Sequence, residues 1–539
     1  MDKTKDLNGS SSAENDAIAG SSNDVKNIKD KKEDKQNNDD NNEPKKKIPK
    51  LEQSNYDEDD DDDDDDEDQL EVAMNNHYSN PQFFNKLKSS WQDQKDFSET
   101  TPDVKIYGEP FRIAILQNFL SDKKVTGLLV NEMEEDVDWS HKQMDLYEFD
   151  QTASLSVVPT MYLKKFLKFL ETSVQPWLEK LCNLKLKSVS ASCSMYNCGD
   201  YLLVHDDLLK DRQIAFVYYL SPWEEVDQWT DEMGGCLEIF KTDDNCFPYF
   251  PVVRKINPRN NQFVFFKVGS KSFHQVGEVT TSEYPRMTIN GWFHGELNTD
   301  TVEDSMRPLS KMVFSVPQTK SMELEKVVNL TYLKEDCKNH IQKHIEDNSE
   351  ICLEKFLKPE IFDKICQELK TNESLIWSIK GPANAQRYET LDLSTLTEPV
   401  ALLIDTFKSK EMFGLLQDYT DLDLAEPRAI TPTVSLELQR WTPGCYTVLG
   451  DGSLCDENTL DLMFFLNAAD DVGCITYLSP EEENDSDYDE SVLLTIKPKD
   501  NALNIVYRCE GTTKFTKYVS KLTPIENGPV YVLCCSYKE

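Results

Sequence analysis

A repeat at a constant offset is the feature that most constrains how this chain can fold. At a spacing of 245 residues, Val189-Ser190 matches Val434-Ser435, Tyr196 matches Trp441, Gly199 matches Gly444 and Tyr201 matches Tyr446. Upstream of each copy, Phe119-Leu120 and Phe356-Leu357 each stand before a helical pattern. Matches that keep aromatic and glycine positions in one register indicate two copies of one fold.

Apolar spacing predicts helices early in the copies and short strands after them. The predicted helices cover residues 80–93, 121–135 (with Ser121 as the capping residue), 161–182, 329–348 and 359–369. The predicted strands cover residues 111–119, 189–204, 214–220, 236–240, 262–268 and 286–293. This order predicts an α+β, mainly β fold, in which a β-barrel or sandwich is supported by helices.

Composition divides the chain into a tail and two domains. Residues 1–79 are rich in Asn, Asp, Lys and Ser, and we expect them to be a disordered tail. The tail contains an acidic run at 57–68 and a lysine cluster at 44–50, which is either a nuclear-localisation signal or an ordinary basic cluster. We expect the first domain at 80–299, a linker and charged helix at 300–345, and the second domain at 346–539.

Charge and cysteine usage restrict the partners and the compartment. The formal net charge of −40 repels phosphates and attracts basic proteins, although it is also explained by solubility alone. The 14 cysteines show no CxxC spacing and no apolar run approaches 18 residues. We therefore expect reduced thiols in the nucleus or cytoplasm, no direct nucleic-acid partner and no membrane span.

A metal site is predicted by one of three His-x-acid pairs. The pairs are His205 with Asp207, His294 with Glu296, and His344 with Glu346. Only His205 follows an apolar run, residues 201–204, which is typical of a buried strand. A suitably placed second histidine, His274, lies downstream of it. Alternate residues of a strand point the same way, so His205 and Asp207 can converge on one ion. Two imidazoles and a carboxylate are the ligands of non-haem Fe(II); the alternative is a surface hydrogen-bonded pair.

Arg286 lies twelve residues after His274, where its guanidinium could pair with an organic acid.

The second copy lacks the candidate metal ligands. At the 245-residue offset, His205 falls on Gly450 and Asp207 falls on Gly452, and the last histidine of the chain is His344. We therefore expect only the first copy to bind metal.

Three blocks carry a family resemblance. They are Met195-Tyr196-x-x-Gly199-x-Tyr201-Leu202-Leu203-x-His205-Asp206-Asp207, Ser272-Phe273-His274-Gln275-Val276, and Arg286 followed by Gly291-Trp292-Phe293-His294-Gly295. From about residue 80 to 539 the chain resembles the two-domain 2-oxoglutarate- and Fe(II)-dependent prolyl 3-hydroxylases of eukaryotes. The resemblance implies two tandem double-stranded β-helix (jelly-roll) domains, of which the first is catalytic.

The same resemblance assigns roles to side chains. It implies that His205, Asp207 and His274 bind Fe(II) and that Arg286 pairs with the distal carboxylate of 2-oxoglutarate. Tyr219 stands where a family tyrosine bonds that carboxylate, and Tyr196 is a second candidate near the cosubstrate. For Tyr219 the alternative is core packing, because Phe216, Tyr218 and Tyr219 share one aromatic strand. Asp206 is expected to point away from the metal.

The implied reaction is hydroxylation of a proline in the small-subunit ribosomal protein of the decoding centre, affecting translation accuracy and termination. The reaction would need Fe(II), 2-oxoglutarate, O₂ and L-ascorbate. We expect the enzyme to act in the nucleus and cytoplasm. Residues 221–235 are expected to be a mobile flap over a basic substrate segment, or else a solvated loop. Two rival hypotheses are a binding module that senses iron and 2-oxoglutarate, and a hydroxylase of a different protein.

Overall fold

The computed structural model describes residues 70–539 apart from 102, 210, 223–227, 298–311, 426–430, 450–456, 471 and 480–491. Residues Ala73–Glu539 form one compact unit. The predictions for residues 1–69, for residues 300–311 of the linker, and for Gly450 and Gly452 lie outside the described residues. No helix in the described part is long and apolar enough to span a membrane.

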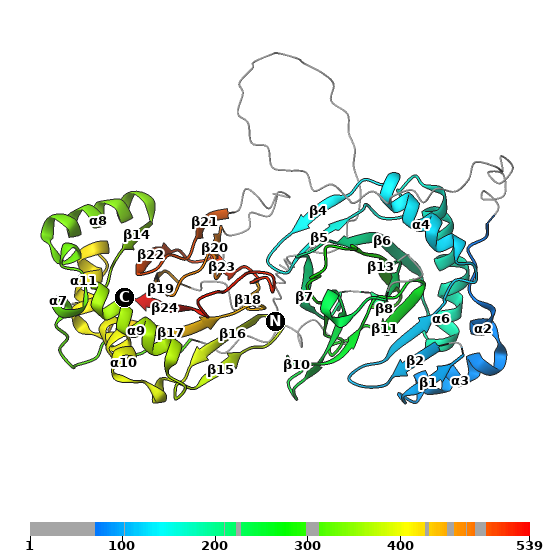
Figure 1. The fold of residues 1–539 in the computed structure, drawn as a ribbon, viewed down its shortest axis with the longest axis horizontal. Helices are drawn as coiled ribbons and strands as arrows, with labels where there is room; N and C mark the ends of the chain where they lie inside the picture. Colours follow the sequence, from blue (N-terminus) through cyan, green and yellow to red (C-terminus); the bar gives the residue numbers. More distant parts are fainter. Residues whose placement is uncertain are drawn as a thin grey trace, which may run out of the picture. The chain divides into compact units, whose positions relative to one another are not determined.

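The N-terminal sheet contains the predicted metal ligands. Its strands are β1 (Phe97–Thr100), β2 (Asp103–Tyr107), β3 (Ile113–Gln117), β4 (Ser140–Gln143), β5 (Tyr147–Gln151), β6 (Ser188–Tyr196), β7 (Tyr201–His205), β8 (Arg212–Tyr219), β9 (Leu237–Thr242), β10 (Pro248–Ile256), β11 (Gln262–Lys267), β12 (His274–Val276) and β13 (Arg286–His294). They pair in the order β1-β2-β3-β11-β8-β13-β6-β5-β7-β12-β9-β10, with β4 beside β5. The sheet curls round, so that β7 lies across its interior from β8 and β11 (Figure 1).

Helices cover the outer face of this sheet near β8 and β11 (Figure 1). They are α2 (Asn76–Ser79), α3 (Pro81–Gln92), α4 (Lys124–Glu135), α5 (Met161–Phe169), the π-helical η1 (Leu170–Val174) and α6 (Gln175–Cys182). Trp91 of α3 contacts Phe265 with ring centroids 5.0 Å apart, and Phe166 of α5 contacts Tyr218 at 5.0 Å. The helices therefore pack on alternate residues of β8 and β11, which leaves the other residues to face the interior.

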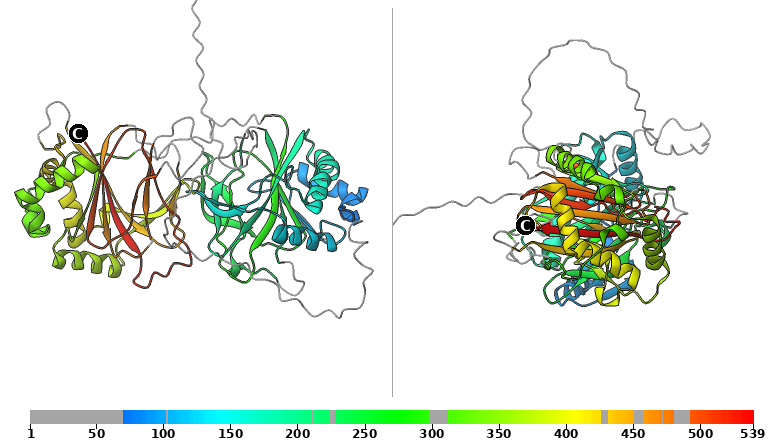
Figure 2. Two further views of the ribbon diagram at one scale, coloured as in Figure 1. Left: turned by 90° about the horizontal axis from the view of Figure 1, so that it is seen from above. Right: turned by 90° about the vertical axis from the view of Figure 1, so that its left-hand side faces the viewer.

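The C-terminal half contains a second sheet with its own helices. Its strands are β14 (Glu350–Glu354), β15 (Trp377–Lys380), β16 (Gln386–Leu391), β17 (Thr433–Trp441), β18 (Tyr446–Thr447), β19 (Thr459–Leu466), β22 (Ala502–Arg508) and β24 (Val530–Lys538). A separate three-stranded sheet contains β20 (Ile475–Leu478), β21 (Val492–Ile496) and β23 (Thr513–Thr516), in the order β21-β20-β23. The helices are α7 (Leu324–Val327), η4 (Leu330–Leu333), α8 (Glu335–Asn348), α9 (Pro359–Thr371), η5 (Leu393–Thr395), α10 (Glu398–Lys408) and α11 (Lys410–Thr420). Helices α8 to α11 lie on one side of the strands (Figure 2).

The two sheets repeat one strand order. The N-terminal run β3-β11-β8-β13-β6 corresponds to β14-β22-β19-β24-β17. Strand β6 spans Ser188–Tyr196 and β17 spans Thr433–Trp441, which are 245 residues apart at both ends. The offset seen in the sequence is therefore a structural repeat in this part of the chain.

An asparagine clamp recurs at the same place in both halves. Asn261 accepts a bond from the N–H of Leu120 (2.8 Å) and donates to its carbonyl (3.0 Å). Asn501 bonds the N–H and carbonyl of Leu357 in the same way, at 2.8 and 2.9 Å. Both asparagines are buried and have positive φ angles, 56° and 55°. The clamps explain why Phe119-Leu120 and Phe356-Leu357 stood out as a repeated pair.

Some predicted elements differ from the structure. The predicted strand 189–204 is two strands, β6 and β7, because the chain turns at Gly199, whose φ is 99°. Ser121 does not cap α4, since its hydroxyl bonds the Ala73 carbonyl instead. Helix α2 lies N-terminal to the predicted boundary at residue 80. Within the described part of the predicted linker, Ser315 pairs with Val434 of the C-terminal sheet.

Candidate active site

His205, Asp207 and His274 come together inside the N-terminal sheet. His205 ends β7, His274 begins β12, and the two residues are direct partners in the strand pairing. The Nε2 atom of His205 is 3.6 Å from Asp207 Oδ1, and Nε2 of His274 is 3.5 Å from Asp207 Oδ2. One ligand atom from each residue lies within 4.8 Å of the others, and no other such cluster of three occurs among the described residues.

Hydrogen bonds orient both imidazoles for metal binding. Nδ1 of His205 is 2.8 Å from the carbonyl oxygen of Leu203, and Nδ1 of His274 is 2.8 Å from that of Ser272. A carbonyl only accepts, so each Nδ1 carries the proton and each Nε2 has a free lone pair. Two unprotonated Nε2 atoms therefore point at one carboxylate, an arrangement that suits a metal ion.

The backbone of Asp207 differs from the simple strand prediction. Asp207 lies beyond the end of β7 and has a φ of 63°, in the left-handed region. The pairing of β7 with β12 also shifts register between His205 and Leu202. The Asp207 carboxylate thus reaches the imidazoles through a left-handed turn after β7 rather than through strand alternation.

Electrostatics favour the protonation states of a metal site. Burial would raise the pKa of Asp207, but the two imidazoles and Arg212 outweigh it and hold the pKa below its usual value. Burial and the neighbouring His205 lower the pKa of His274 to about 4, so this imidazole is neutral at pH 7. A carboxylate and a neutral imidazole are the forms that bind metal.

Arg212 is a residue that sequence reasoning missed. Its Nη1 is 3.8 Å from Asp207 Oδ1, and its guanidinium lies 3.6 Å from the ring centroid of Trp292. Arg212 begins β8, and Trp292 lies on the neighbouring β13. Arg212 therefore pairs with the Asp207 carboxylate while its guanidinium packs on Trp292. The only available signal was that Trp292 belongs to one of the family-like blocks.

Arg286 is a buried cation. It is 1% exposed, its Nε donates to the Gly235 carbonyl (2.8 Å), and Nη2 donates to the Tyr219 hydroxyl at 3.4 Å. Within the described part of the chain, no carboxylate forms an ion pair with it. A buried guanidinium without a counter-ion is costly, so this position fits an anionic ligand.

Tyr219 and Tyr196 both lie beside Arg286. The guanidinium carbon is 4.9 Å from the Tyr196 ring centroid and 5.1 Å from that of Tyr219. Tyr218 faces the helices, as its contact with Phe166 shows, so Tyr219 faces the interior. Because adjacent residues of a strand face opposite sides, Tyr218 packs on the helices and Tyr219 is available to the site. Tyr196 also stacks on Phe149 at 4.8 Å, which gives it a packing role as well.

The other sequence candidates have ordinary roles. His294 bonds Asp211 through Nδ1 (2.9 Å) and Ser190 through Nε2 (2.7 Å). His344 lies on α8, away from any described metal cluster. Asp206 accepts a bond from the N–H of Leu208 at 3.0 Å and so shapes the turn after β7.

The C-terminal sheet carries apolar residues where the N-terminal sheet carries Arg286 and Tyr219. Arg286 pairs with Tyr196, and at the same register Val530 pairs with Trp441. Two residues further on, Thr288 pairs with Tyr219, whereas Val532 pairs with Phe465. Val530 and Phe465 belong to one buried hydrophobic cluster. At these two positions the described part of the C-terminal half is packed with apolar side chains, so it offers no counterpart of Arg286 and Tyr219.

The C-terminal half contacts the backbone that orients Arg286. The carbonyl of Glu278 accepts from Gly235 N–H (3.0 Å), and the Gly235 carbonyl in turn accepts from Arg286. The buried Glu278 carboxylate accepts bonds from Tyr518 Oη (3.2 Å), Lys521 N–H (2.7 Å) and Ser520 Oγ. Both halves therefore contribute to the position of this arginine.

The donor set fits Fe(II) and an organic dicarboxylate. Two neutral imidazoles and one carboxylate can hold the ion and leave positions open, and Arg286 with Tyr219 can hold a carboxylate nearby. Iron, 2-oxoglutarate and O₂ together supply the oxidising chemistry that hydroxylates an unactivated C–H bond. The fold and site thus define a 2-oxoglutarate- and Fe(II)-dependent oxygenase.

Comparison with known proteins identifies the family. A model of the 2OG-Fe(II) oxygenase superfamily matches residues 191–294, and a model described as oxoglutarate and iron-dependent oxygenase degradation C-term matches residues 319–539. The chain is 54% identical to prolyl 3-hydroxylase sudestada1 of Drosophila melanogaster over 87% of this chain and 91% of the relative. It is 27% identical to prolyl 3-hydroxylase OGFOD1 of Mus musculus, over 81% and 89% respectively. The chain therefore belongs to the family of 2-oxoglutarate- and Fe(II)-dependent prolyl hydroxylases, and the predicted family is confirmed.

Proposed function

We propose that this enzyme hydroxylates C3 of a proline in a basic protein of the small ribosomal subunit, at the decoding centre, and thereby affects translation accuracy and termination. The position on the ring is suggested by the relatives from Drosophila melanogaster and Mus musculus, which are named prolyl 3-hydroxylases. A basic substrate suits a chain whose formal net charge is −40. We further infer that the enzyme acts in the nucleus and cytoplasm and uses ascorbate to maintain Fe(II).

Within this proposal, His205, Asp207 and His274 hold Fe(II), and Arg286 holds the distal carboxylate of 2-oxoglutarate with help from Tyr219. The observation that carries the assignment is the buried Arg286. It has no counter-ion among the described residues and faces the interior of the N-terminal sheet, as the triad does. We also infer that each half is a double-stranded β-helix, because the two sheets share one strand order.

The proposal is tested by mass spectrometry of a decoding-centre ribosomal peptide incubated with the full chain, Fe(II), ascorbate and 2-oxoglutarate. The expected product carries one added oxygen on proline, and amino-acid analysis should identify 3-hydroxyproline. The Asp207→Ala variant should give no product. A relative from Ostreococcus tauri is named a prolyl 3,4-dihydroxylase, so a second added oxygen is scored separately.

Other outcomes would redirect the proposal. Slow succinate formation without peptide oxidation would mean that the enzyme acts on a different protein. Oxidation only at C4 would refute the proposed position on the ring. If neither succinate nor hydroxyproline formed, a binding module that senses iron and 2-oxoglutarate would replace the proposed activity.

A further inference from the structure

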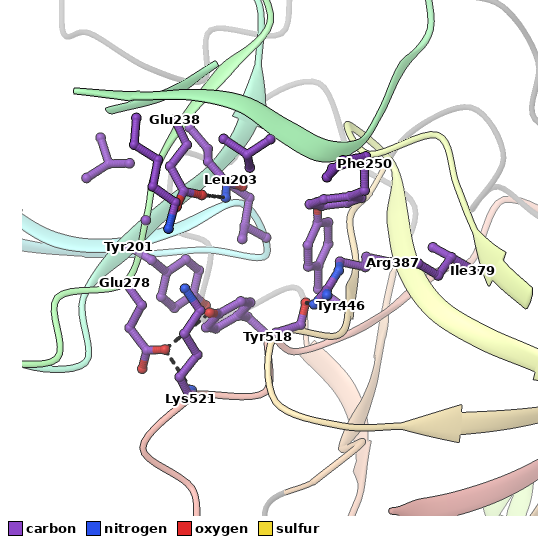
Figure 3. Close-up of a pocket in the computed structure, with 17 residues that line it drawn as sticks. Tyr201, Leu203, Glu238, Phe250, Glu278, Ile379, Arg387, Tyr446, Tyr518 and Lys521 are labelled. Atoms are coloured by element: carbon purple, nitrogen blue, oxygen red, sulfur yellow. Dashed lines mark hydrogen bonds and ion pairs between the residues drawn. The ribbon is translucent and has the colours of Figure 1, made fainter. Parts of the chain in front are cut away.

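A cavity separate from the proposed active site lies between the N-terminal sheet and the C-terminal half (Figure 3). Its volume is about 410 Å³. The N-terminal side includes Tyr201 of β7 and Phe250 of β10, and the C-terminal side includes Arg387, Tyr446 and Tyr518. None of the three proposed metal ligands lines it, and neither does Arg286. A cavity of this size is typical of small-molecule sites.

Aromatic rings form much of the cavity wall. Tyr201 and Tyr518 come from different halves of the chain, and their ring centroids are 4.3 Å apart. The ring centroids of Tyr446 and Tyr518 are 6.2 Å apart. Phe250 contacts the Arg387 guanidinium, whose central carbon is 4.9 Å from the ring centroid. Such walls suit a ligand with an apolar body.

Both carboxylates of the cavity already have partners in the protein. Glu238 accepts a bond from Gln275 Nε2 (2.5 Å) and pairs with Lys255 at 3.5 Å. Glu278 accepts bonds from Tyr518 and from the backbone N–H of Lys521 (Figure 3). These acids are therefore not free to bind a cationic ligand.

Several donors around the cavity lack an acceptor. Arg387 donates Nη1 to the Gly444 carbonyl (2.7 Å), but its buried Nε has no hydrogen-bond partner. The Tyr201 hydroxyl is also buried without a partner, on a residue that is 3% exposed. Lys521 is an exposed residue of the cavity lining, and its Nζ forms no ion pair with any described residue. Leaving buried donors unpaired costs free energy, so the cavity is short of hydrogen-bond acceptors.

We propose that this cavity binds a small organic carboxylate with an apolar body. The carboxylate accepts from Arg387 and Lys521, and the body lies among Tyr201, Tyr446 and Phe250. The site differs from the cosubstrate site in its lining residues, and the proposal does not depend on the proposed ribosomal substrate. Because Gln275 lines the cavity and follows His274 directly, a ligand here contacts the strand that carries a proposed metal ligand.

The test is ¹⁹F NMR of 4-fluorophenylacetate with the full chain, using redox-inert Zn(II) in place of iron and saturating 2-oxoglutarate to occupy the cosubstrate site. The neutral 4-fluorophenylacetamide is the matched probe of the same shape. We expect saturable binding of the acid and at least about tenfold weaker binding of the amide, since charge-assisted bonds to arginine are lost.

Variants locate the binding site. Arg387→Met and Lys521→Met should each weaken binding of the acid, whereas Lys364→Met, an exposed charge change on α9, should not. Arg387→Lys retains the charge and should bind better than Arg387→Met, and thermal unfolding identifies any variant that fails to fold. The proposal is overturned if the acid does not bind at millimolar concentration, if excess 2-oxoglutarate displaces it, or if Lys521→Met and a folded Arg387 variant bind it as the wild type does.

Discussion

At the scale of the residue, the candidate site depends on how the protein positions lone pairs and charges before any ligand arrives. The carbonyls of Leu203 and Ser272 accept the Nδ1 protons of the two histidines and so direct both Nε2 atoms toward Asp207. Arg286 is kept in place by the Gly235 carbonyl and the Tyr219 hydroxyl, and donors that these two bonds do not use are left for an anion. Preorganisation of this kind reduces the cost of binding the metal and cosubstrate.

Arg286→Lys should raise the KM for 2-oxoglutarate by about ten- to a hundredfold, because an ammonium group cannot replace a forked pair of charge-assisted bonds. Succinate formation measured against 2-oxoglutarate concentration would show it. Tyr219→Phe, which removes one hydroxyl at 3.4 Å from Arg286, should have a smaller effect. An unchanged KM in Arg286→Lys would refute the role of this arginine.

Asp207→Ala should abolish Fe(II) binding at this site, because the two imidazoles alone supply too few ligands and too little charge. Calorimetric titration with Mn(II), which takes the same ligands without oxidation, measures this. Asp211→Ala is the control, since Asp211 bonds His294 outside the triad. Equal Mn(II) affinity in the wild type and Asp207→Ala would show that the metal binds elsewhere.

At the scale of the element, the repeated asparagine clamp connects each sheet to the segment before its helices. Asn501→Ala should lower the free energy of unfolding by roughly 2–4 kcal/mol, since two buried backbone groups of Leu357 lose their partners. Chemical unfolding followed by circular dichroism measures the change. Asn348→Ala, at an exposed bond near the end of α8, should change it by less than about 1 kcal/mol.

Periodicity predicted the regular elements better than the site geometry. Helix α3 and strand β11 closely match their predicted ranges because their apolar spacing is strong. Strand β4 was missed because all its residues are exposed and polar. The left-handed turn at Asp207 could not be predicted, since it depends on the position of His274 in another strand.

At the scale of the whole molecule, the C-terminal half supports the N-terminal half through Glu278. Its carboxylate is buried and takes three bonds from the segment Tyr518–Lys521. Where the N-terminal sheet carries Arg286 and Tyr219, the C-terminal sheet carries the buried apolar side chains of Val530 and Phe465. These contacts give the C-terminal half a supporting role.

Glu278→Ala should therefore destabilise the protein by roughly 2–4 kcal/mol, because several donors on the C-terminal half lose a buried acceptor. Urea unfolding followed by tryptophan fluorescence measures this loss. Glu283→Ala changes an exposed acid in the same loop and is the matched control. If Glu278→Ala lost no more unfolding free energy than Glu283→Ala, the supporting role would be refuted.

Removal of residues 1–69 should leave hydroxylation of a short peptide unchanged. The truncation ends at 69 because the carbonyl of Ala73 and the bridge between Met74 and Leu120 belong to the folded unit. Turnover of the truncated and full chains, compared at equal concentration, tests the prediction. Loss of turnover with retained folding would show that the N-terminal segment takes part in catalysis.

We infer that one site, made of His205, Asp207, His274 and Arg286, serves both iron and 2-oxoglutarate. The most direct measurement is a crystal structure of the full chain grown without oxygen with Fe(II) and 2-oxoglutarate, with anomalous data collected at the iron edge. We predict a single strong iron peak at bonding distance from both Nε2 atoms and Asp207, with the distal carboxylate on Arg286. An iron peak away from the triad, or a cosubstrate that leaves Arg286 unpaired, would refute this assignment of the site.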